Sequence, residues 1–370
     1  MSQSLVKKKI DAAKIFNCKD FEPFINSIEE VLSYRGVSMS HFYICNIEGV
    51  RFLTKLSFYR KTAPELYSRL KSNTIPQVDA EIQILEKLRD RIIVPGVSPC
   101  ILELVYEKRC NRVTSAVSKK MCKDITFGTE GTLYESVQQM LCLYNDLVYR
   151  GLAHDRCAFI VLERCDITLD EYLRKMYNTP ISVAILRSLL FQIIYTFYSI
   201  SRIYPKFRHN DLHTENVMLK VDLRYKFDST KPKYMRFIVG DTVHYVPYFG
   251  IIAKIIDFGY SQIPEENILS NATDDLVNMF YRSKNDLLLL FYWIHNTLKN
   301  TPSPGNEEIF RILEKLEPNR SYILYQTERI RGIESLIPTY ADMVHNNIFS
   351  DYKKDRNLRP EDIFGTYRSD

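Results

Sequence analysis

The apolar pattern of this chain changes near Glu163–Asp166, and this change limits the folds open to it. Before that point, segments such as HFYICNI and VRFLTKLSF are rich in aromatic and β-branched residues, which is typical of strands. Beyond it, ISVAILRSLLFQIIYTFYSIS is apolar on nearly every side, which is typical of a buried core helix. The 370 residues exceed one ordinary hydrophobic core, so we expect two lobes or domains of mixed α and β structure.

Local patterns predict the individual elements. The first forty residues are predicted to be helical, because IDAAKIF and FEPFINSIEEVLSY carry apolar residues three and four apart. Two hairpin turns are predicted, at Glu48-Gly49 and at Gly240-Asp241. The other expected elements are helices over 79–88, 133–152 and 168–177 and strands over 98–109 and 158–164.

Composition and charge exclude several classes of protein. A net charge of +5 without a dense Lys/Arg stripe does not favour nucleic acid as a partner. The first residues lack the apolar segment of a secretory signal, and the run in DLLLLFYWIH is too short to span a bilayer. We therefore expect a soluble intracellular protein. No two of the eight cysteines form a C-x-x-C pair, so we expect reduced thiols rather than a zinc site or disulfide framework.

The chemistry is concentrated in FRHNDLHTENVMLK, residues 207–220. This segment places His209, Asp211 and Asn216 in an H-x-D-x-x-x-x-N pattern, and Asp257-Phe258-Gly259 follows later behind the apolar run IIAKII. Phosphoryl transfer needs a carboxylate that accepts a hydroxyl proton and oxygen ligands that hold magnesium against the phosphates. One loop with Asp and Asn five apart, and a second Asp after a buried strand, supply these groups.

This arrangement resembles the eukaryotic-like protein kinases, most of all those encoded by large DNA viruses. Those proteins also carry a long insert before Asp-Phe-Gly and a late phrase like NNIFSDYKK. The resemblance covers about residues 35–300 and implies an α+β bilobal fold, with a small β-rich N-lobe carrying one αC helix and a larger, mainly α-helical C-lobe. The implied divisions are a helical extension over 1–34, an N-lobe over 35–163 with an insert at about 109–156, and a C-lobe over 164–370 with an insert at about 221–252.

The resemblance also implies roles for five polar residues. Asp211 is the expected catalytic base, and Asn216 and Asp257 are the expected Mg²⁺ ligands. Lys55, in a predicted strand, corresponds to the lysine that holds the ATP phosphates. Glu81, in the helix that looks like αC, corresponds to the carboxylate that fixes this lysine.

Further positions fit an adenine site and a scaffold. Leu162 corresponds to the gatekeeper, and the backbone of Glu163 and Cys165 would face the adenine edge. Leu53 and Met218 would lie against the adenine ring. The expected scaffold residues are Asp286, which would anchor the backbone of the catalytic loop, and a column of His209, Phe258 and Leu85. Ordinary core packing accounts for most of these positions equally well.

The chain departs from the kinase pattern at several places. Gly36 is the one glycine where the family has a Gly-rich phosphate loop, and Leu53 stands where alanine is usual. Asn210 replaces the arginine that pairs with an activation-loop phosphate, so we expect activity without that phosphorylation. His213 replaces a lysine that steadies the transferring phosphate. The segment from Gly259 to Asp286 is short and contains no A-P-E.

Three functions remain open. The leading prediction is an ATP- and Mg²⁺-dependent protein kinase directed at serine or threonine of an unknown protein substrate, located in the cytoplasm of the host, or in the virion, if the chain is viral. A small-molecule kinase of the same fold is favoured by the D-L-H-x-x-N phrase and the short segment after Asp257. A pseudokinase scaffold is favoured by the missing glycines and Leu53, and opposed by the five polar residues.

Overall fold

The computed structural model describes residues 9–33, 40–61, 75–117, 122, 133–175, 183–270, 285–301, 305–319, 337–354 and 358–369. The chain divides into two compact units. The first comprises Met1–Ile82 and Glu103–Arg164, and the second comprises Gln83–Leu102 and Cys165–Asp370. Both contain strands and helices, so the predicted α+β class is confirmed.

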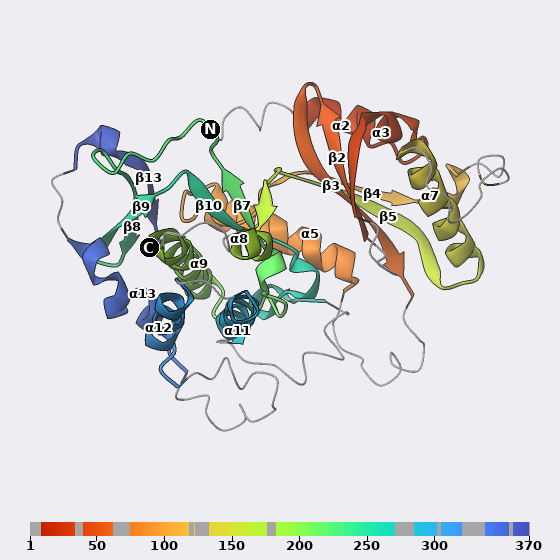
Figure 1. Cartoon of the computed structure of the whole chain (residues 1–370). Coiled ribbons are helices and arrows are strands. Elements are labelled where there is room, and N and C mark those ends of the chain that lie inside the picture. Colours follow the sequence, from red (N-terminus) through yellow and green to blue (C-terminus); the bar gives the residue numbers. More distant parts are fainter. Residues whose placement is uncertain are drawn as a thin grey trace. The chain divides into compact units, whose positions relative to one another are not determined.

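A five-stranded antiparallel sheet forms the centre of the first unit (Figure 1). Its strands are β1 (Ile28–Ser33), β2 (Ser40–Ile47), β3 (Val50–Arg60), β4 (Leu104–Asn111) and β5 (Ala153–Leu162). They lie in the order β1-β2-β3-β5-β4. The predicted hairpin between β2 and β3 is confirmed, because Glu48 and Gly49 both have positive φ, 52° and 77°, as a two-residue type I′ turn requires.

Strand β1 corrects the prediction that the first forty residues are helical. Helices α2 (Lys9–Ile15) and α3 (Glu22–Ser27) are present, but from Ile28 the chain is extended and pairs with β2. Ile28 is buried, whereas Val31 and Leu32 are exposed at the sheet edge. Helix propensities differ by fractions of about 1 kcal/mol per residue, so sheet pairing outweighs the helical periodicity of this segment.

Helices α2, α3 and α7 (Leu133–Tyr149) pack on the sheet of the first unit (Figure 1). The predicted helix over 133–152 is thereby confirmed. Aromatic rings fill the interface: the ring centroid of Phe159 in β5 lies 5.1 Å from that of Phe16 and 4.9 Å from that of Phe24. Phe58 of β3 stacks on Tyr144 of α7 at 3.9 Å. Because side chains alternate along a strand, Lys55 of β3 lies on the face opposite Phe58.

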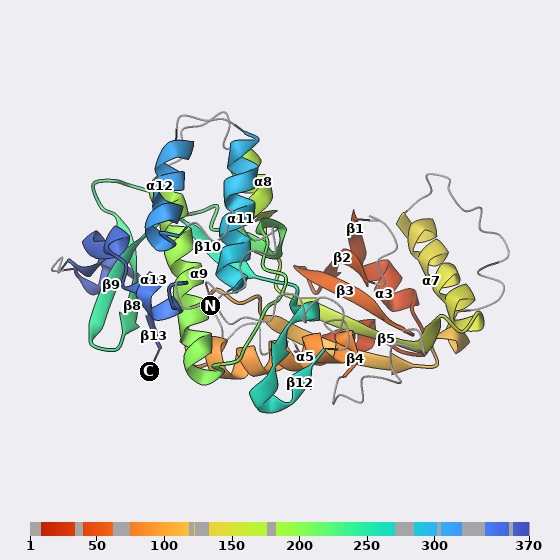
Figure 2. The ribbon, with the colours of Figure 1, turned by 90° about the horizontal axis from the view of Figure 1, so that it is seen from below.

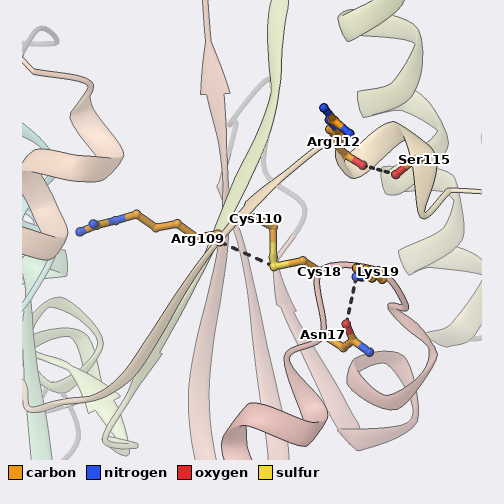
Figure 3. The surroundings of a disulfide bond; sticks show 7 residues. All are labelled: Asn17, Cys18, Lys19, Arg109, Cys110, Arg112 and Ser115. Atoms are coloured by element: carbon orange, nitrogen blue, oxygen red, sulfur yellow. Dashed lines mark hydrogen bonds between the residues drawn. A yellow bond between two sulfur atoms is a disulfide. The ribbon is translucent and has the colours of Figure 1, made fainter.

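Two disulfide bonds correct the prediction of reduced thiols. Cys18, just after α2, is bonded to Cys110 of β4 (Figure 3), and Cys122 is bonded to Cys142 of α7. The partners are 92 and 20 residues apart in sequence, so only the packing of α2 and α7 on the sheet brings them together. The free cysteines of the described residues are Cys45, Cys100, Cys157 and Cys165, all buried.

Helix α9 (Val183–Ile203) is the core helix of the second unit, as predicted. It is long and apolar enough to cross a membrane, but most of it is buried inside this unit. Helix α12 (Asn306–Leu316) packs against both α9 and α11 (Asn285–Lys299), as Figure 2 shows. The remaining helices are α8 (Leu169–Lys175), α13 (Tyr340–Val344) and α5 (Gln77–Leu88), which has residues in both units and continues into a π-helical turn over Arg89–Ile93.

The strands that the structure describes in the second unit form three small sheets. The first has the order β10-β7-β6, the second pairs β11 with β12, and the third has the order β13-β8-β9. Their bounds are β6 (Ile167–Thr168), β7 (Val217–Val221), β8 (Lys233–Val239), β9 (Thr242–Tyr248), β10 (Ile251–Ile255), β11 (Gln262–Ile263), β12 (Ile268–Leu269) and β13 (Ile363–Arg368). Short 3₁₀ turns cover Val113–Ser115, Thr214–Asn216, Phe258–Tyr260, Pro264–Glu266, Asn347–Lys353 and Pro360–Asp362.

The segment before Asp257 forms a hairpin that a late strand completes. The predicted turn at Gly240-Asp241 is confirmed between β8 and β9. Strand β13, which the sequence did not predict, pairs in parallel with β8. Its Phe364 stacks on Tyr248 with ring centroids 3.8 Å apart. The hairpin is therefore one part of a three-stranded sheet.

His244 of β9 is fully buried next to Phe191 of α9, with ring centroids 4.9 Å apart. Within the described part of the chain, neither of its ring nitrogens has a hydrogen-bond partner. Burial, together with the charges of Lys353 and His345, lowers the pKa of His244 to about 3. The imidazole is therefore neutral in the folded protein at physiological pH.

This burial predicts a loss of stability in mild acid. Between pH 6.5 and 3 the unfolded chain binds a proton at His244 and the folded protein does not, so the free energy of unfolding falls as pH falls. The expected loss from this group between pH 7 and pH 5 is about 2 kcal/mol. Urea unfolding at both values is expected to show this loss in the wild type and a smaller one in His244→Phe. Equal losses in the two proteins would contradict the prediction.

The disulfide bonds predict a redox dependence of stability. Cys18–Cys110 closes a loop of 92 residues, and the loop-entropy relation gives about 4 to 5 kcal/mol for its loss. Cys122–Cys142 closes a shorter loop, so its removal is expected to cost about 3 kcal/mol. Guanidinium unfolding of Cys18→Ser and Cys122→Ser, each with and without dithiothreitol, checks both values. Eight titratable thiols in the unreduced, denatured wild type would show that neither bond forms.

Candidate active site

The first unit holds a buried ion pair between β3 and α5. Lys55 Nζ lies 2.8 Å from each carboxylate oxygen of Glu81, and the two residues are 5% and 4% exposed. Burying two charges removes their hydration, and their mutual attraction offsets this cost only when the geometry is good. A buried ion pair is therefore weak evidence for stability. The pair makes an ammonium group rigid, which is what a site for phosphates needs.

A second set of contacts fixes the first turn of α5. Asp79 accepts a hydrogen bond from the Tyr59 hydroxyl at 2.7 Å and lies 3.3 Å from Arg109 Nε. Arg156 lies over the Tyr59 ring, 4.3 Å from its centroid. These contacts join α5 to β3, β4 and β5 and so hold the helix that carries Glu81.

The predicted adenine residues of the first unit lie in β3 and at the end of β5. Leu53 pairs in register with Leu162, and both side chains are buried. The backbone N–H of Glu163 donates to the carbonyl of Glu103 at 3.0 Å, and its carboxylate accepts the Glu103 N–H at 3.0 Å. These two bonds do not involve the carbonyl of Glu163. They neither support nor exclude the predicted contact of the Glu163 backbone with the adenine edge.

In the second unit, Asp286 of α11 holds the backbone of the predicted catalytic loop. Its two carboxylate oxygens accept the N–H groups of His209 at 2.9 Å and Asn210 at 2.8 Å. Burial raises the pKa of Asp286, against the lowering effect of His209 and these backbone donors. The predicted anchoring contact is therefore present. His209 also lies 5.1 Å from Phe258, ring to ring, as expected for the predicted column.

Within this loop, Asp211 and Asn216 contact each other directly. The Asn216 amide donates to the Asp211 carbonyl at 2.8 Å and to its carboxylate at 3.1 Å. The Asp211 side chain stays partly exposed, so its carboxylate can reach a substrate. Because the NH₂ group of Asn216 is turned toward Asp211, its carbonyl oxygen is the atom left for a cation.

Asp257 follows β10, which is bonded to the catalytic loop. The N–H of Ile256 donates to the carbonyl of Asn216 at 3.0 Å, and His209 Nε2 lies 2.9 Å from the carbonyl of Ile256. Asp257 itself has a φ of 59°, in the left-handed region, which aspartate and asparagine adopt more readily than other residues with a side chain.

The donor set of these residues fits magnesium. Mg²⁺ in phosphate-transfer sites is bound by one or two carboxylates together with substrate oxygens, and amide oxygens serve in the same way. Asn216 and Asp257 supply one amide and one carboxylate. Among the described residues no group of three or more His, Cys, Asp or Glu side chains is arranged to hold a metal alone.

His213 lies beside the predicted base. Its Nε2 is 3.7 Å from an Asp211 carboxylate oxygen, its Nδ1 accepts the Glu215 N–H at 3.3 Å, and its ring is 6.0 Å from that of Trp293. Burial acts to lower the pKa of His213, but the hydrogen bond and charge of Asp211, with the charges of Glu215 and Asp257, raise it overall. More of this imidazole is therefore protonated near neutral pH than in an ordinary histidine.

Asn210 holds the segment that follows Asp257-Phe258-Gly259. Its side-chain amide donates to the carbonyl of Tyr260 at 2.8 Å, and its backbone has a φ of 66°, which asparagine tolerates well. Next to it, the hydroxyl of Ser261 donates to the carbonyl of His209 at 3.1 Å. Tyr260 and Ser261 are thus held by neutral hydrogen bonds next to the position where the kinase family has an arginine that pairs with a phosphate.

The predicted residues thus assemble within each unit. Lys55 and Glu81 are paired in the first unit, and Asp211, His213 and Asn216 are in contact in the second. The remaining predicted residues are Met218, half-buried in β7, Cys165, a buried thiol at the start of a segment of the second unit, and Gly36, which lies outside the described residues.

Sequence reasoning missed two carboxylates that support these groups. Asp79 and Asp170 were taken only as parts of amphipathic helices. Both stand in a first helical turn, where acidic residues are common for electrostatic reasons alone. No spacing signal distinguishes such residues from solvated ones.

Comparison with known proteins finds sequence similarity to proteins named as kinases. It matches no model of a known protein family. Two proteins of Acanthamoeba polyphaga mimivirus, both named as serine/threonine-protein kinases, are 27% identical over 267 residues and 24% identical over 272 residues. These matches cover 68% and 71% of this chain, and 64% and 52% of the relatives, so this chain spans between half and two-thirds of their length.

The chain is therefore similar in sequence to proteins that are named as viral protein kinases. The predicted resemblance is therefore confirmed. A Dictyostelium discoideum protein, also named as a serine/threonine-protein kinase, is 36% identical over 127 residues, which cover 31% of this chain and 9% of that protein. A solved structure of WaaP in complex with acyl carrier protein has a TM-score of 0.39 and 10% identity, covering 89% of this chain and 92% of that one, and this likeness is too low to support a conclusion.

The Lys55–Glu81 pair predicts a large stability effect. Glu81→Gln leaves a buried ammonium without its counter-charge, so the free energy of unfolding is expected to fall by about 3 kcal/mol. Replacing both residues, as Lys55→Met with Glu81→Leu, is expected to cost less than the single change. Asp146→Asn, which removes the exposed pair of Asp146 with Arg150, is the control and is expected to cost under about 1 kcal/mol. Urea unfolding at pH 7 gives all three values, and a Glu81→Gln protein as stable as the wild type would contradict the expectation.

Proposed function

We propose that this protein transfers the γ-phosphoryl group of ATP to a serine or threonine hydroxyl of a protein. The observation that carries the proposal is the assembled catalytic loop, in which Asp211 is partly exposed, bonded to Asn216, and held through Asp286. The names of the mimivirus relatives support the same activity. A location in the cytoplasm of a host cell is part of this proposal.

In this mechanism Asp211 orients the acceptor hydroxyl and takes its proton. The hydroxyl oxygen forms a bond to the γ-phosphorus while the bond from that phosphorus to the bridging oxygen breaks, and ADP leaves with the electron pair. The Asn216 amide holds the Asp211 carboxylate in one orientation, because it bonds both its carbonyl and its side chain. Orientation of this kind supplies much of the rate in phosphoryl transfer.

The other predicted site residues are assigned to the nucleotide, its phosphates and the metal ion. Lys55, fixed by Glu81, is assigned to the phosphates of ATP, and Glu163, Cys165, Leu53, Met218 and Gly36 to nucleotide binding. Asn216 and Asp257 would hold Mg²⁺, which when bound neutralises charge on the phosphates. His213, whose pKa is raised by its acidic neighbours, would donate a hydrogen bond to the transferring phosphate.

A small-molecule kinase is the second candidate, and His213 favours it. The histidine two residues after the base belongs to a phrase shared with small-molecule phosphotransferases as well as with atypical protein kinases. A protein kinase is expected to label itself or a basic protein with radioactive ATP. A small-molecule kinase labels neither and consumes ATP only with its own metabolite. A pseudokinase gives no turnover, and a thermal shift with Mg-ATP then reports whether it binds nucleotide.

The mechanism predicts the effect of removing each carboxylate. Asp211→Asn and Asp257→Asn are expected to lower the rate of phosphoryl transfer by at least about 100-fold, since each removes a charge needed in the transition state. Asp228→Asn changes an exposed aspartate of the same unit and is the matched control. Initial rates of transfer from radioactive ATP to a protein panel measure the effect. Near-wild-type turnover in either active-site variant would overturn the assignment.

The bond from Asn210 to Tyr260 predicts independence from phosphorylation. Because neutral hydrogen bonds already hold Tyr260 and Ser261, removing phosphate groups is expected to change the transfer rate by less than about twofold. The measurement compares phosphatase-treated and untreated protein, with phosphorylation state verified by mass spectrometry. A kinase known to need its activation-loop phosphate serves as the control for the phosphatase. Complete loss of activity here would show that Asn210 does not replace such a phosphate.

A further inference from the structure

A buried carboxylate outside the predicted site connects the catalytic loop to two helices. Asp170 lies in α8 and is 8% exposed. One of its oxygens accepts hydrogen bonds from the hydroxyls of Thr214 and Thr297, each at 3.0 Å. Its other oxygen accepts from Arg174 Nε at 2.6 Å. Thr214 belongs to the catalytic loop and Thr297 to α11, so one side chain joins three segments.

Helix stability alone does not explain this arrangement. Arg174 and Asp170 form an i,i+4 pair, but the guanidinium is largely exposed, and such pairs form without burial of the carboxylate. Burying an ionised carboxylate is costly unless donors replace its water. Here burial acts to raise the pKa of Asp170, and the hydrogen bonds from Arg174, Thr297 and Thr214 lower it overall. The group is therefore a charged acceptor, and hydrogen bonds to charged acceptors are the strong class.

Thr214 lies at the start of the turn that carries Asn216. It follows His213 and opens the 3₁₀ turn Thr214–Asn216, which in the backbone is closed by the bond from Asn216 N–H to the His213 carbonyl at 2.9 Å. A turn of three residues has little stability of its own. The side chain of Thr214 is buried, so its bond to Asp170 holds the turn from the side of the core.

Asn216 connects the turn Thr214–Asn216 to Asp211. The Asn216 side chain leaves this turn and donates to both the carbonyl and the carboxylate of Asp211. A small rotation of the turn would move that amide away from Asp211, and misplacement by about 1 Å can cost about 100-fold in rate.

We propose that Asp170 is a positioning residue for phosphoryl transfer: by holding Thr214 it fixes the turn Thr214–Asn216, and with it the direction of the Asn216 amide toward Asp211. The inference rests on the proposed function. It assigns no contact of Asp170 with substrate. It also predicts that Thr297, bonded to the same oxygen but located in α11, supports the fold rather than the rate.

Matched substitutions on both sides of the bond test the proposal. Asp170→Asn and Thr214→Val are each expected to lower kcat by about 10- to 100-fold with less than about a threefold change in KM for ATP. Thr214→Ser restores the hydroxyl and is expected to restore kcat to within about threefold. The double variant is expected to be no slower than the slower single variant, because both changes break one interaction. Thr297→Val and Arg174→Gln, which alter other donors to the same carboxylate, are expected to leave kcat within about threefold.

A second measurement separates this proposal from the proposed function. Hydrogen–deuterium exchange of a peptide covering residues 209–217 is expected to quicken in Asp170→Asn and Thr214→Val and to match the wild type in Thr214→Ser. Hydrogen–deuterium exchange can be measured without enzymatic activity. If the wild-type protein transfers no phosphoryl group, the proposed function is refuted, and the exchange rates alone then test whether Asp170 holds the turn. If Asp170→Asn does not fold, the comparison of Thr214→Val with Thr214→Ser still tests the proposal. Wild-type kcat and wild-type exchange in Thr214→Val would overturn the proposal.

Discussion

Two backbone hydrogen bonds to one buried carboxylate hold the loop on which the proposed chemistry depends. Asp286 accepts the N–H groups of His209 and Asn210, immediately before Asp211. Asp286 lies in α11, a helix with a largely buried apolar face, so the loop takes its position from a regular element of the second unit. Without Asp286, the buried N–H of His209 would lose its partner, which costs about 1–3 kcal/mol, and the half-buried N–H of Asn210 would lose its partner as well.

The same physical principle recurs at each charged group of the site. Lys55 is fixed by Glu81, the turn after His213 is bonded to Asp170, and the Asn216 amide is turned toward Asp211. In every case a costly buried or half-buried polar group has donors or acceptors on a helix, strand or turn that cannot move independently. Preorganisation of this kind distinguishes a site suited to phosphoryl transfer from a set of solvated surface residues.

Local patterns predicted much of the fold, and non-local contacts account for what they missed. The turn at Glu48-Gly49 and helices α7 and α9 follow from residues adjacent in sequence, and the structure has them. Strand β1, the disulfide of Cys18 with Cys110, and strand β13 depend on partners far along the chain. At the site, the five-residue interval that phosphoryl-transfer chemistry favours selected Asp211 and Asn216. The structure has these two residues in contact, and their catalytic roles stay predictions. Asp170 has no such interval, and its role is visible only from the hydroxyls packed around it.

The parallel pairing of β13 with β8 has a consequence for synthesis on the ribosome. Hairpin β8–β9 joins neighbouring residues and can form as soon as it leaves the exit tunnel, but the bond from Ser369 to Ile238 spans 131 residues. Until residues 363–368 leave the exit tunnel, one side of β8 offers unpaired N–H and C=O groups to any other extended chain. Nascent molecules are thus open to mutual aggregation through β8 during this interval, and any delay in the emergence of β13 lengthens the exposure.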